Sequence, residues 1–457
     1  MTKIQLFAIS PIDGRYHAEV DHLRLIFSEF ALMKYRVFTE VEWLIAIWPI
    51  VKPEQTTLSA QQQKLLRLLH AEFDEHAANR VKAIEATCRH DVKAVEYYLQ
   101  EQLLKMPELK GLANFVHYGL TSEDVNSVAY ALMLKAGADI WAETSGQLSS
   151  VLAKMIDAHA DLPMLSRTHG QPASPTTLGK EIANFQFRLT RQQQLLAKQP
   201  IFAKMNGAVG NYHALAICHP DVDWPAFIES FLSSMSLVHH PMCTQIEPHD
   251  YIHELLSTMA RANLVLLDFC RDFWGYISLG YFKQVVYPGE VGSSVMPHKV
   301  NPIHFENAEA NLGMANGLID HMCQKLPISR FQRDLSDSSV LRNVGMIFAY
   351  HEIAVKNMLR GLEKIVPDVD VMRQDLDGKY VLLAEAIQTM MRLHQVDHAY
   401  EKLKAFTQGK AITDQDLADF IAQLPLPTMA KEKLLGLAVH DYVGLAKVLA
   451  LKHTNGS

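Results

Sequence analysis

The 457-residue chain has 49% hydrophobic and 20% charged residues, a composition typical of a globular protein rather than of a disordered or fibrous one. A formal net charge of -7 excludes a globally basic surface for nucleic acid, so the cations that hold any anionic ligand must be clustered locally. The five cysteines lie far apart and form no CxxC pair, which argues against a disulfide framework and a zinc site and favours a reducing cytoplasm.

The N-terminal part of the chain predicts helices. Apolar residues at spacings of three and four predict a helix over residues 20–47, which Pro49 would stop. The same period predicts helices over 61–69 and 92–104.

The middle of the chain predicts five longer helices. Three cover residues 122–160, 176–197 and 251–279, and two more cover 302–324 and 338–365. Helices this long and this apolar need partners on more than one face. We therefore expect a helix bundle that is extended by homo-oligomerisation.

The C-terminal part predicts a small helical domain. Pro367 begins a polar stretch, and shorter helices are expected over 380–393, 397–407 and 414–422. The predicted fold class is all-α, with a long central helix bundle flanked by two smaller helical domains. The expected domains are an N-terminal one over 1–111, a central one over 112–365 and a C-terminal one over 366–457.

Neither export nor membrane insertion is expected. The first residues lack the continuous apolar core and the cleavage site of a secretory signal. The most apolar helical stretch, 262–279, favours burial in a bundle because charged residues interrupt it. These residues are Asp268, Arg271 and Asp272.

Three segments rich in Gly, Pro, Ser and Thr are predicted as loops between the helices, where catalytic groups tend to lie. They cover 166–177, 206–212 and 288–302. The third contains GEVGSSVMPHKVNP, which combines glycines, serines, a lysine and an asparagine. Its composition suits a loop that closes over an anion, and equally an ordinary surface turn.

Residues 292–302, GSSVMPHKVNP, resemble the signature loop of the fumarase/aspartase superfamily, whose members eliminate fumarate from succinyl-type substrates. The resemblance implies that Ser293 is the general base and that Lys299 and Asn301 bind substrate. Removal of a proton beside a carboxylate adds a second negative charge, which a cation and hydrogen-bond donors must stabilise. A serine is a poor base, so its alkoxide would need backbone N–H groups and positive charge once the loop closes.

The segment SRTHGQPAS, residues 166–174, carries His169. A lone histidine is more often structural than catalytic, although its near-neutral pKa suits proton transfer. The run resembles the S-x-T-H-x-Q-x-A motif of the same superfamily, in which adenylosuccinate lyases use this histidine as the general acid on the leaving nitrogen. The resemblance assigns that role to His169.

Recognition of a phosphate separates the members of the superfamily. The segments SPIDGRY and SRFQRDLSDSSVLRN offer guanidinium and hydroxyl groups suited to a phosphate. Their arginines can equally pair with acids such as Asp334 and Asp337 on a solvated face. Both segments resemble adenylosuccinate lyases, as do RHDV and TSED, and the matches run from about residue 10 to 345. Substrate contacts are implied for Arg15, Tyr16, Arg89, His90, Asp91, Thr121, Ser122, Gln245, Asn307, Arg333, Ser338, Ser339, Val340, Leu341 and Arg342.

For two of these motifs the sequence leaves the role of the residues open. Thr121 and Ser122 suit the N-cap of the long helix that follows, and the same helix N-terminus suits a substrate carboxylate. His90 is expected to help position substrate. Because neighbouring histidines can titrate as a coupled pair, sequence does not separate the roles of His90 and His169.

The resemblance implies a C–N lyase without cofactor or metal that releases fumarate from adenylosuccinate, giving AMP, and from succinylaminoimidazole carboxamide ribotide, giving AICAR, in purine nucleotide biosynthesis. His249 and His253 are spaced like metal ligands, but no third ligand accompanies them. A cytoplasmic homotetramer with active sites shared between subunits is implied, with neither nucleic acid nor membrane as partner. Two alternatives stay open: a sister lyase acting on argininosuccinate or malate, and a non-catalytic helical protein.

Overall fold

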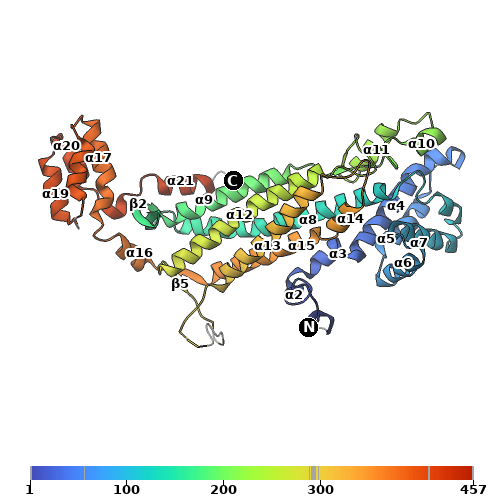
Figure 1. Ribbon diagram of the computed structural model, residues 1–457, viewed down its shortest axis with the longest axis horizontal. Helices are drawn as coiled ribbons and strands as arrows, with labels where there is room; N and C mark the ends of the chain where they lie inside the picture. Colours follow the sequence, from blue (N-terminus) through green and yellow to red (C-terminus); the bar gives the residue numbers. More distant parts are fainter. Residues whose placement is uncertain are drawn as a thin grey trace. The chain divides into compact units, whose positions relative to one another are not determined.

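The computed structural model describes residues 3–55, 57–287, 289, 295–296, 298–409 and 412–454. Helices make up most of these residues, as Figure 1 shows, and the all-α fold class with its bundle of long helices is confirmed. The strands of the described residues form three two-stranded pairs.

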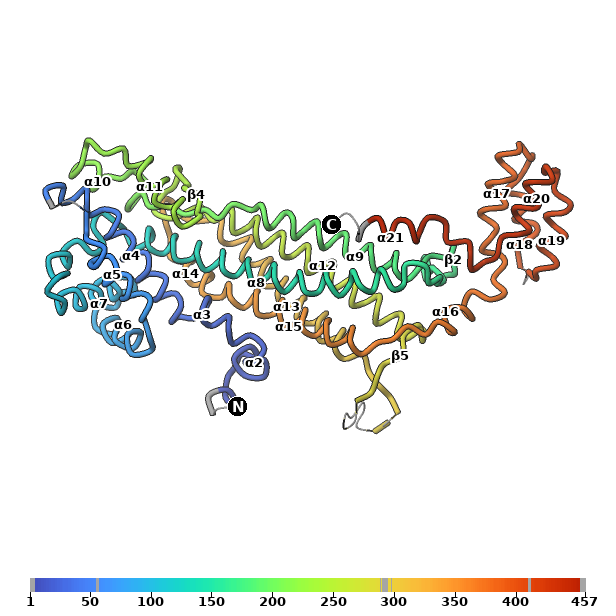
Figure 2. The backbone as a smooth tube through the Cα atoms, turned by 180° about the vertical axis from the view of Figure 1, so that it is seen from behind, coloured from blue at the N-terminus to red at the C-terminus, as the bar shows by residue number. Residues whose placement is uncertain are grey.

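The chain divides into two compact units. The first contains residues 1–145, 192–264 and 310–355, and the second contains 146–191, 265–309 and 356–457. Five long helices contribute residues to both units, and within each unit the segments of these helices lie side by side in Figures 1 and 2. They are α8 (Ser122–Ala158), α9 (Leu178–Ala197), α12 (Asp250–Ser278), α13 (Ile303–Lys325) and α15 (Val344–Glu363). The predicted division into three domains stays a prediction.

The first unit has its own shorter elements. In chain order they are α1 (Lys3–Leu6), α2 (His17–Val20), η1 (Asp21–Leu23), α3 (Arg24–Phe27), α4 (Glu29–Val51), η2 (Pro53–Gln55), α5 (Ala60–Ala71), α6 (Glu75–Cys88), α7 (Asp91–Lys105), η3 (Lys110–Phe115), β3 (Phe202–Ala203), α10 (His213–Cys218), α11 (Trp224–Ser233), β4 (Val238–His239) and α14 (Ser336–Leu341).

The shorter elements of the second unit begin with a hairpin and end with small helices. They are β1 (Pro163–Thr168), β2 (Gln171–Thr177), β5 (Phe282–Gln284), β6 (Ile365–Pro367), α16 (Val369–Leu376), η4 (Tyr380–Leu383), α17 (Ala384–Leu393), α18 (Ala399–Thr407), α19 (Asp414–Gln423), α20 (Thr428–Leu435), η5 (Val439–Asp441) and α21 (Ala446–Thr454).

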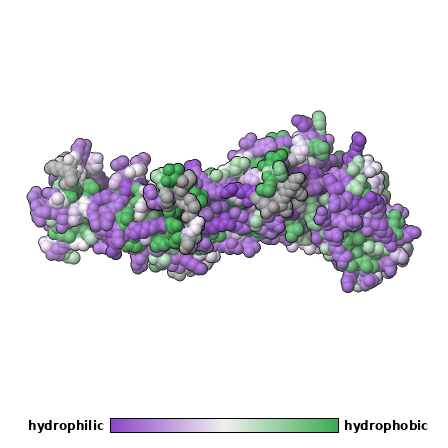
Figure 3. Space-filling model, turned by 90° about the horizontal axis from the view of Figure 1, so that it is seen from below, coloured by the Kyte–Doolittle hydropathy of each residue, from purple (hydrophilic) through white to green (hydrophobic). Residues whose placement is uncertain are grey.

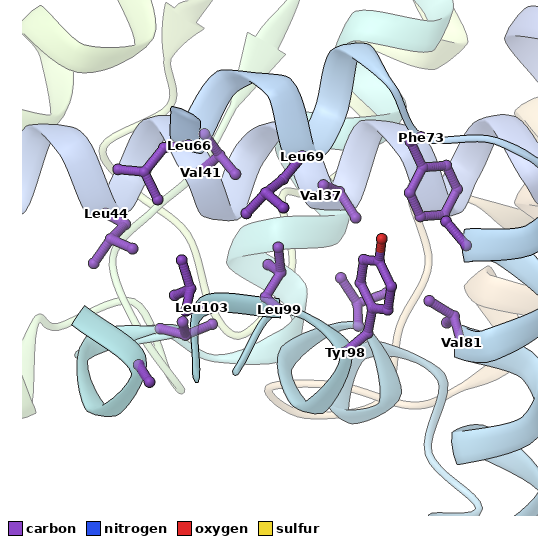
Figure 4. Packing of buried hydrophobic residues seen from close by; sticks show 14 of the residues in the cluster. Val37, Val41, Leu44, Leu66, Leu69, Phe73, Val81, Tyr98, Leu99 and Leu103 are labelled. Carbon is purple, nitrogen blue, oxygen red and sulfur yellow. The ribbon is translucent and has the colours of Figure 1, made fainter. Parts of the chain in front are cut away.

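A hydrophobic core joins α4 to α7 in the first unit. Figure 4 shows Val37 and Val41 of α4 facing Leu69 of α5, with Leu99 and Leu103 of α7 on the other side. Each of these side chains is almost fully buried, which contributes roughly 1.5–3 kcal/mol per residue to folding. The core therefore holds α4 and α7 in place, and both helices carry residues of the candidate site.

The start of the first long helix differs from its prediction over 20–47. The chain instead forms the short helices α2, η1 and α3, and then Ser28 takes an extended conformation and caps α4, its side chain accepting a hydrogen bond from the N–H of Ala31 at 3.1 Å. Helix α4 also continues past Pro49 to Val51. A proline so near a helix end removes one hydrogen bond without ending the helix.

The segment 166–177 was predicted as a loop, and that prediction was wrong. Strands β1 and β2 pair antiparallel, with Thr168 opposite Gln171. The two residues between them, His169 and Gly170, have φ of 53° and 73°, as a tight type I′ hairpin turn requires. The strands lack the apolar alternation by which a hairpin is recognised in sequence.

The C-terminal part of the second unit has its own core. Leu383, Ile387 and Met391 pack with Ile421 and Leu434 from the helices that follow. Within the described residues no single helix is both long and apolar enough to cross a membrane. One pair bent by 95°, Thr428–Leu435 with Val439–Lys452, passes the same test of length and composition.

Candidate active site

A pocket of about 390 Å³ in the first unit brings together many of the predicted site residues. It lies where α4, the turn between α6 and α7, the first turn of α8 and the region of α14 meet. Its lining includes Arg36, Glu85, Arg89, His90, Asp91, Val92, Ser122, Glu123, Asn126, Tyr130, Arg333, Leu335, Ser338, Ser339 and Arg342. Four arginines line one pocket of a chain that is acidic overall, so the local cluster of cations expected from the sequence exists.

The turn between α6 and α7 is built by Arg89 and His90. Arg89 ends α6 with a left-handed φ of 54°, and its N–H donates to the carbonyl of Glu85 at 2.7 Å. His90 caps α7, because its Nδ1 accepts a hydrogen bond from the N–H of Lys93 at 3.2 Å. The imidazole that the sequence assigns to substrate therefore also has a structural task, and its ring stays half exposed beside the pocket.

Asp91 anchors two of the arginines. Its carboxylate accepts hydrogen bonds from Arg36 at 2.8 Å and from Arg342 at 2.9 Å, and another from the N–H of Val92. Burial raises the pKa of this carboxyl, but Arg36, the Val92 N–H and Arg342 together outweigh burial and bring the pKa below its ordinary value. Asp91 is therefore a fixed anion that orients cations toward the pocket.

Sequence reasoning missed Arg36. This side chain is only 2% exposed, and its Nε donates to Asn126 at 2.9 Å while Nη2 donates to Asp91. Its Nη1 is buried without a hydrogen-bond partner among the described residues. The available signal was a charged residue within the apolar stretch FALMKYRVF, where a buried arginine needs paired acceptors.

Arg342 lies between two carboxylates. Its Nη1 donates to Glu29 at 2.5 Å, and its Nη2 donates to Asp91. Burial lowers the pKa of the guanidinium, but Glu29, Tyr130 and Asp91 raise it above its ordinary value. An anion that binds Arg342 must therefore compete with the carboxylates that already hold it.

We expect the substitution Glu29→Gln to strengthen the binding of inorganic phosphate about threefold, since it removes one competing anion worth less than about 1 kcal/mol. Titration calorimetry at low ionic strength measures the change. The control is Glu42→Gln, because Glu42 lies on the same helix but pairs with Arg67 at 2.8 Å. Weaker binding by Glu29→Gln would mean that Glu29 orients Arg342 rather than competing for it.

The guanidinium of Arg333 contacts two predicted site residues, Gln245 and Ser338, and also Glu123, which follows the predicted residue Ser122. Its Nη1 donates to Glu123 at 2.8 Å and to the side-chain oxygen of Gln245 at 3.2 Å. Its Nη2 donates to the hydroxyl of Ser338 at 3.1 Å. The guanidinium is mostly buried, so it presents a rigid, oriented charge to the pocket.

The start of α8 is tied to a buried ion pair. Asp124 accepts a hydrogen bond from the N–H of Thr121 at 2.8 Å, which is one half of a capping box. The same carboxylate lies 2.7 Å from the ammonium of Lys204, and both side chains have an exposed fraction of 0%. The ammonium also donates to the carbonyls of Gly207 and Gln245, at 2.9 and 2.8 Å. This pair fixes Gln245 relative to the residues that begin α8.

Some predicted residues of the first unit lie outside the lining of the pocket. Arg15 is exposed, with its guanidinium 5.9 Å from the centre of the Tyr16 ring. Leu341 is buried beside a small cavity behind the pocket, and Val340 is half buried. A neighbouring pocket of about 240 Å³, lined by residues of 10–28 and α15, shares Arg342.

The remaining predicted residues belong to the second unit. His169 is exposed at the tip of the β1–β2 hairpin. Lys299 is exposed, the carbonyl of Asn301 accepts the N–H of Ile303 at 2.9 Å, and Asn307 is half buried in α13. Ser293 lies outside the described residues.

In the part of the chain that the structure describes, no group of three or more His, Cys, Asp or Glu side chains has an arrangement that could hold a metal ion. His249 is buried between two carboxylates, whereas His253 is exposed on α12.

Comparisons with known proteins extend over nearly the whole chain. The family model described as lyase matches residues 14–317, and the model described as adenylosuccinate lyase C-terminal matches residues 329–443. Two solved structures share the fold: a fumarate lyase from Mesorhizobium sp. BNC1 (TM-score 0.74, 18% identity, 96% of this chain and 98% of that chain) and the 3-carboxy-cis,cis-muconate lactonizing enzyme from Pseudomonas putida (TM-score 0.73, 22% identity, 95% and 96%). The fold and these matches define a lyase of the fumarase/aspartase superfamily.

Curated relatives narrow the assignment. The chain is 48% identical to the adenylosuccinate lyase of Vibrio cholerae serotype O1, over 96% of this chain and 97% of the relative. It is 46% identical to that of Escherichia coli K12, over 96% and 97%, and 48% identical to that of Legionella pneumophila strain Philadelphia 1, over 98% and 99%. The chain belongs to the adenylosuccinate lyase family.

Proposed function

We propose that this protein eliminates fumarate from adenylosuccinate, giving AMP, and from succinylaminoimidazole carboxamide ribotide, giving AICAR, in purine nucleotide biosynthesis. The observation that carries the proposal is the pocket of the first unit, where Arg333 and Arg342 lie with Ser338. Guanidinium groups match the geometry of phosphate oxygens, and a hydroxyl adds a further donor. A nucleotide phosphate is the group that these residues suit best.

The chemistry of the proposal is a β-elimination. Ser293 removes a proton from the succinyl carbon beside a carboxylate, and Lys299 and Asn301 stabilise the extra negative charge on that carboxylate. The C–N bond then breaks as the carbon–carbon double bond of fumarate forms. His169 donates a proton to the departing nitrogen, so the atoms and charges balance. The placement of charge alone makes the carbon acidic, so the proposed reaction uses no cofactor.

The remaining contacts are supported by the pocket lining for some residues and by the family motifs alone for the others. His90 and Ser122 line the phosphate-binding pocket. The side chain of Gln245 contacts Arg333, and this contact supports a role for Gln245 in binding the substrate. We assign Thr121 and Ser122 to a substrate carboxylate, because the start of α8 presents N–H groups to an anion. The proposal keeps the contacts of Arg15, Tyr16, Arg89, Asp91, Asn307, Ser339, Val340 and Leu341 with substrate.

We further propose a cytoplasmic homotetramer whose active sites contain residues from more than one subunit. Large apolar side chains are exposed on the long helices, including Leu264 and Met314 in the first unit and Phe187 and Trp274 in the second. Figure 3 shows hydrophobic patches on a face that is otherwise mostly hydrophilic. Contact between copies would bury such residues. Neither nucleic acid nor a membrane is a proposed partner.

The test is turnover of adenylosuccinate by the purified protein, followed by ultraviolet absorbance, with fumarate and AMP identified as products. Protein carrying Ser293→Ala and purified in the same way controls for a contaminating lyase. Turnover of argininosuccinate or malate in place of adenylosuccinate would overturn the proposal in favour of a sister lyase. A folded protein that releases fumarate from none of the three would indicate a non-catalytic role.

A further inference from the structure

A buried cluster of one histidine and two acids lies beside Arg333 in the first unit. We call Glu247, His249 and Asp337 the His249 cluster. His249 Nδ1 lies 3.5 Å from Glu247 Oε2, and its Nε2 lies 3.5 Å from Asp337 Oδ2. Both ring nitrogens thus face carboxylates, and only an imidazolium carries N–H donors on both. The geometry indicates a protonated His249.

The backbone of His249 is held in an uncommon conformation. Its φ is 67°, in the left-handed region that a histidine seldom adopts. Its N–H donates to Glu247 Oε2 at 2.7 Å, so the carboxylate contacts both the backbone and the ring of the same residue. Backbone strain of this kind persists where the surrounding contacts hold it, and it gathers at functional sites.

The cluster touches the phosphate-binding residues through Asp337. Asp337 Oδ1 accepts the N–H of Ser338 at 2.7 Å and lies 3.8 Å from Nη2 of Arg333. The same Nη2 donates to the Ser338 hydroxyl. The carboxylate of Asp337 therefore contacts His249 with one oxygen. Its other oxygen contacts Arg333 and Ser338, the two residues that suit a phosphate.

The charges around Arg333 explain why a cation is needed behind it. Glu123 lies 2.8 Å from the guanidinium, and Asp337 adds a second acid nearby. Glu247 Oε1 is buried without a hydrogen-bond partner among the described residues, and Nε2 of His240 lies 3.9 Å from it. Without a positive His249, Asp337 would lose its other cation, so Asp337 and Glu123 would both depend on one guanidinium, and the attraction of Arg333 for a phosphate would fall.

The pKa of His249 determines the pH range over which its ring is positively charged. Burial lowers its pKa, but Asp337 and Glu247 outweigh burial and raise the pKa to about 9, while the pKa of Asp337 is lowered. Because the folded pKa exceeds the ordinary value of about 6.5, the charge is complete at neutral pH and is lost as pH rises through about 9. Other titratable or charged groups near the cluster are Glu123, Tyr251, His240, Arg333 and Cys243.

We propose that protonated His249 is a positioning residue, which balances Glu247 and Asp337 so that Arg333 and Ser338 keep their charge and orientation for the nucleotide phosphate. The proposal rests on the proposed function, since it assigns a phosphate to this pocket. His249 does not line that pocket, so its effect passes through Asp337.

The test is the affinity for AMP, measured by calorimetry at pH 7.5 on the full-length protein. His249→Asn suits the site because asparagine tolerates a left-handed φ and carries no charge. We expect about tenfold weaker binding, a matching rise in KM and a kcat within about threefold of the wild type. The matched control is His253→Asn on the exposed face of α12, which should leave the affinity unchanged.

A charge-balance variant separates electrostatics from shape. Adding Asp337→Asn to His249→Asn removes the acid that has lost its cation beside Arg333, while the asparagine oxygen can still accept the N–H of Ser338, so the affinity should return to within about threefold of the wild type. Unchanged affinity in His249→Asn, or weakened affinity without recovery in the double variant, would overturn the proposal. If wild-type protein fails to bind AMP at all, the proposed function fails instead.

The wild type supplies an independent measurement that needs no variant to fold. Its AMP affinity should fall about tenfold between pH 7.5 and 10, as His249 loses its proton, because the AMP phosphate is already ionised over that range. A flat profile would overturn the proposal. Circular dichroism of each variant shows whether the protein is folded before binding is compared.

Discussion

Protein carrying His169→Ala and protein carrying Ser293→Ala should each lose about 10²–10⁴-fold of kcat, and a mixture of the two should recover activity. In the proposed mechanism each residue transfers one of the two protons of the elimination, so neither variant would complete it. If the active sites of the proposed tetramer combine residues from several subunits, subunit exchange places an intact His169 and an intact Ser293 in some sites. The measurement is turnover of adenylosuccinate before and after mixing.

The control mixes His169→Ala with His169→Gln, which cannot complement because both lack the same group. Native mass spectrometry of subunits with different tags verifies exchange. No recovery after verified exchange would show that both residues of a site come from one chain. If His169→Ala keeps more than about a tenth of the wild-type kcat, the general acid is another residue, with His90 the first to test.

The substitution Lys204→Met should lower the free energy of unfolding by about 3–5 kcal/mol. Lys204 and Asp124 are fully buried and 2.7 Å apart, so removal of the ammonium leaves a buried carboxylate without its cation. The carbonyls of Gly207 and Gln245 lose a donor at the same time. Urea denaturation followed by circular dichroism measures the change.

An exposed ion pair provides the comparison. Lys180→Met removes a cation 3.0 Å from Glu181, but Lys180 is 40% exposed, so the expected cost is below about 1 kcal/mol. The double variant Lys204→Met with Asp124→Asn should recover part of the loss, because it removes the buried charge. A loss below about 1 kcal/mol for Lys204→Met would contradict the account of Asp124 as a buried anion.

The sequence predicted the helices well because their signal is local. The apolar period predicted 122–160, 251–279 and 302–324, and the structure has α8, α12 and α13 within two residues of those bounds. The helix predicted over 338–365 is divided into α14 and α15 around Arg342 and Asn343, because the apolar pattern continues where the backbone turns. Helix α6 was not predicted, although its buried residues Ala77, Ala78, Val81 and Ile84 follow a helical spacing.

In the site, too, local motifs predicted some features, and contacts between distant residues were not predicted. Arginine and serine motifs predicted residues that bind a phosphate, and four of them, Arg89, Arg333, Ser338 and Arg342, line one pocket. Nothing in the motifs indicated that Glu29 competes for Arg342, because the two residues are 313 positions apart in sequence. In the structure, Nη1 of Arg342 lies 2.5 Å from a carboxylate oxygen of Glu29.

The sequence by itself determined the helical fold class, the family and the types of side chain available for proton transfer and phosphate binding, because helix periodicity and family motifs are local patterns. Only the tertiary structure decided which charges are paired. Arg36 with Asp91, Lys204 with Asp124 and His249 with Asp337 join residues distant in sequence. The charge and orientation of these groups depend on distance and burial, and folding alone sets both.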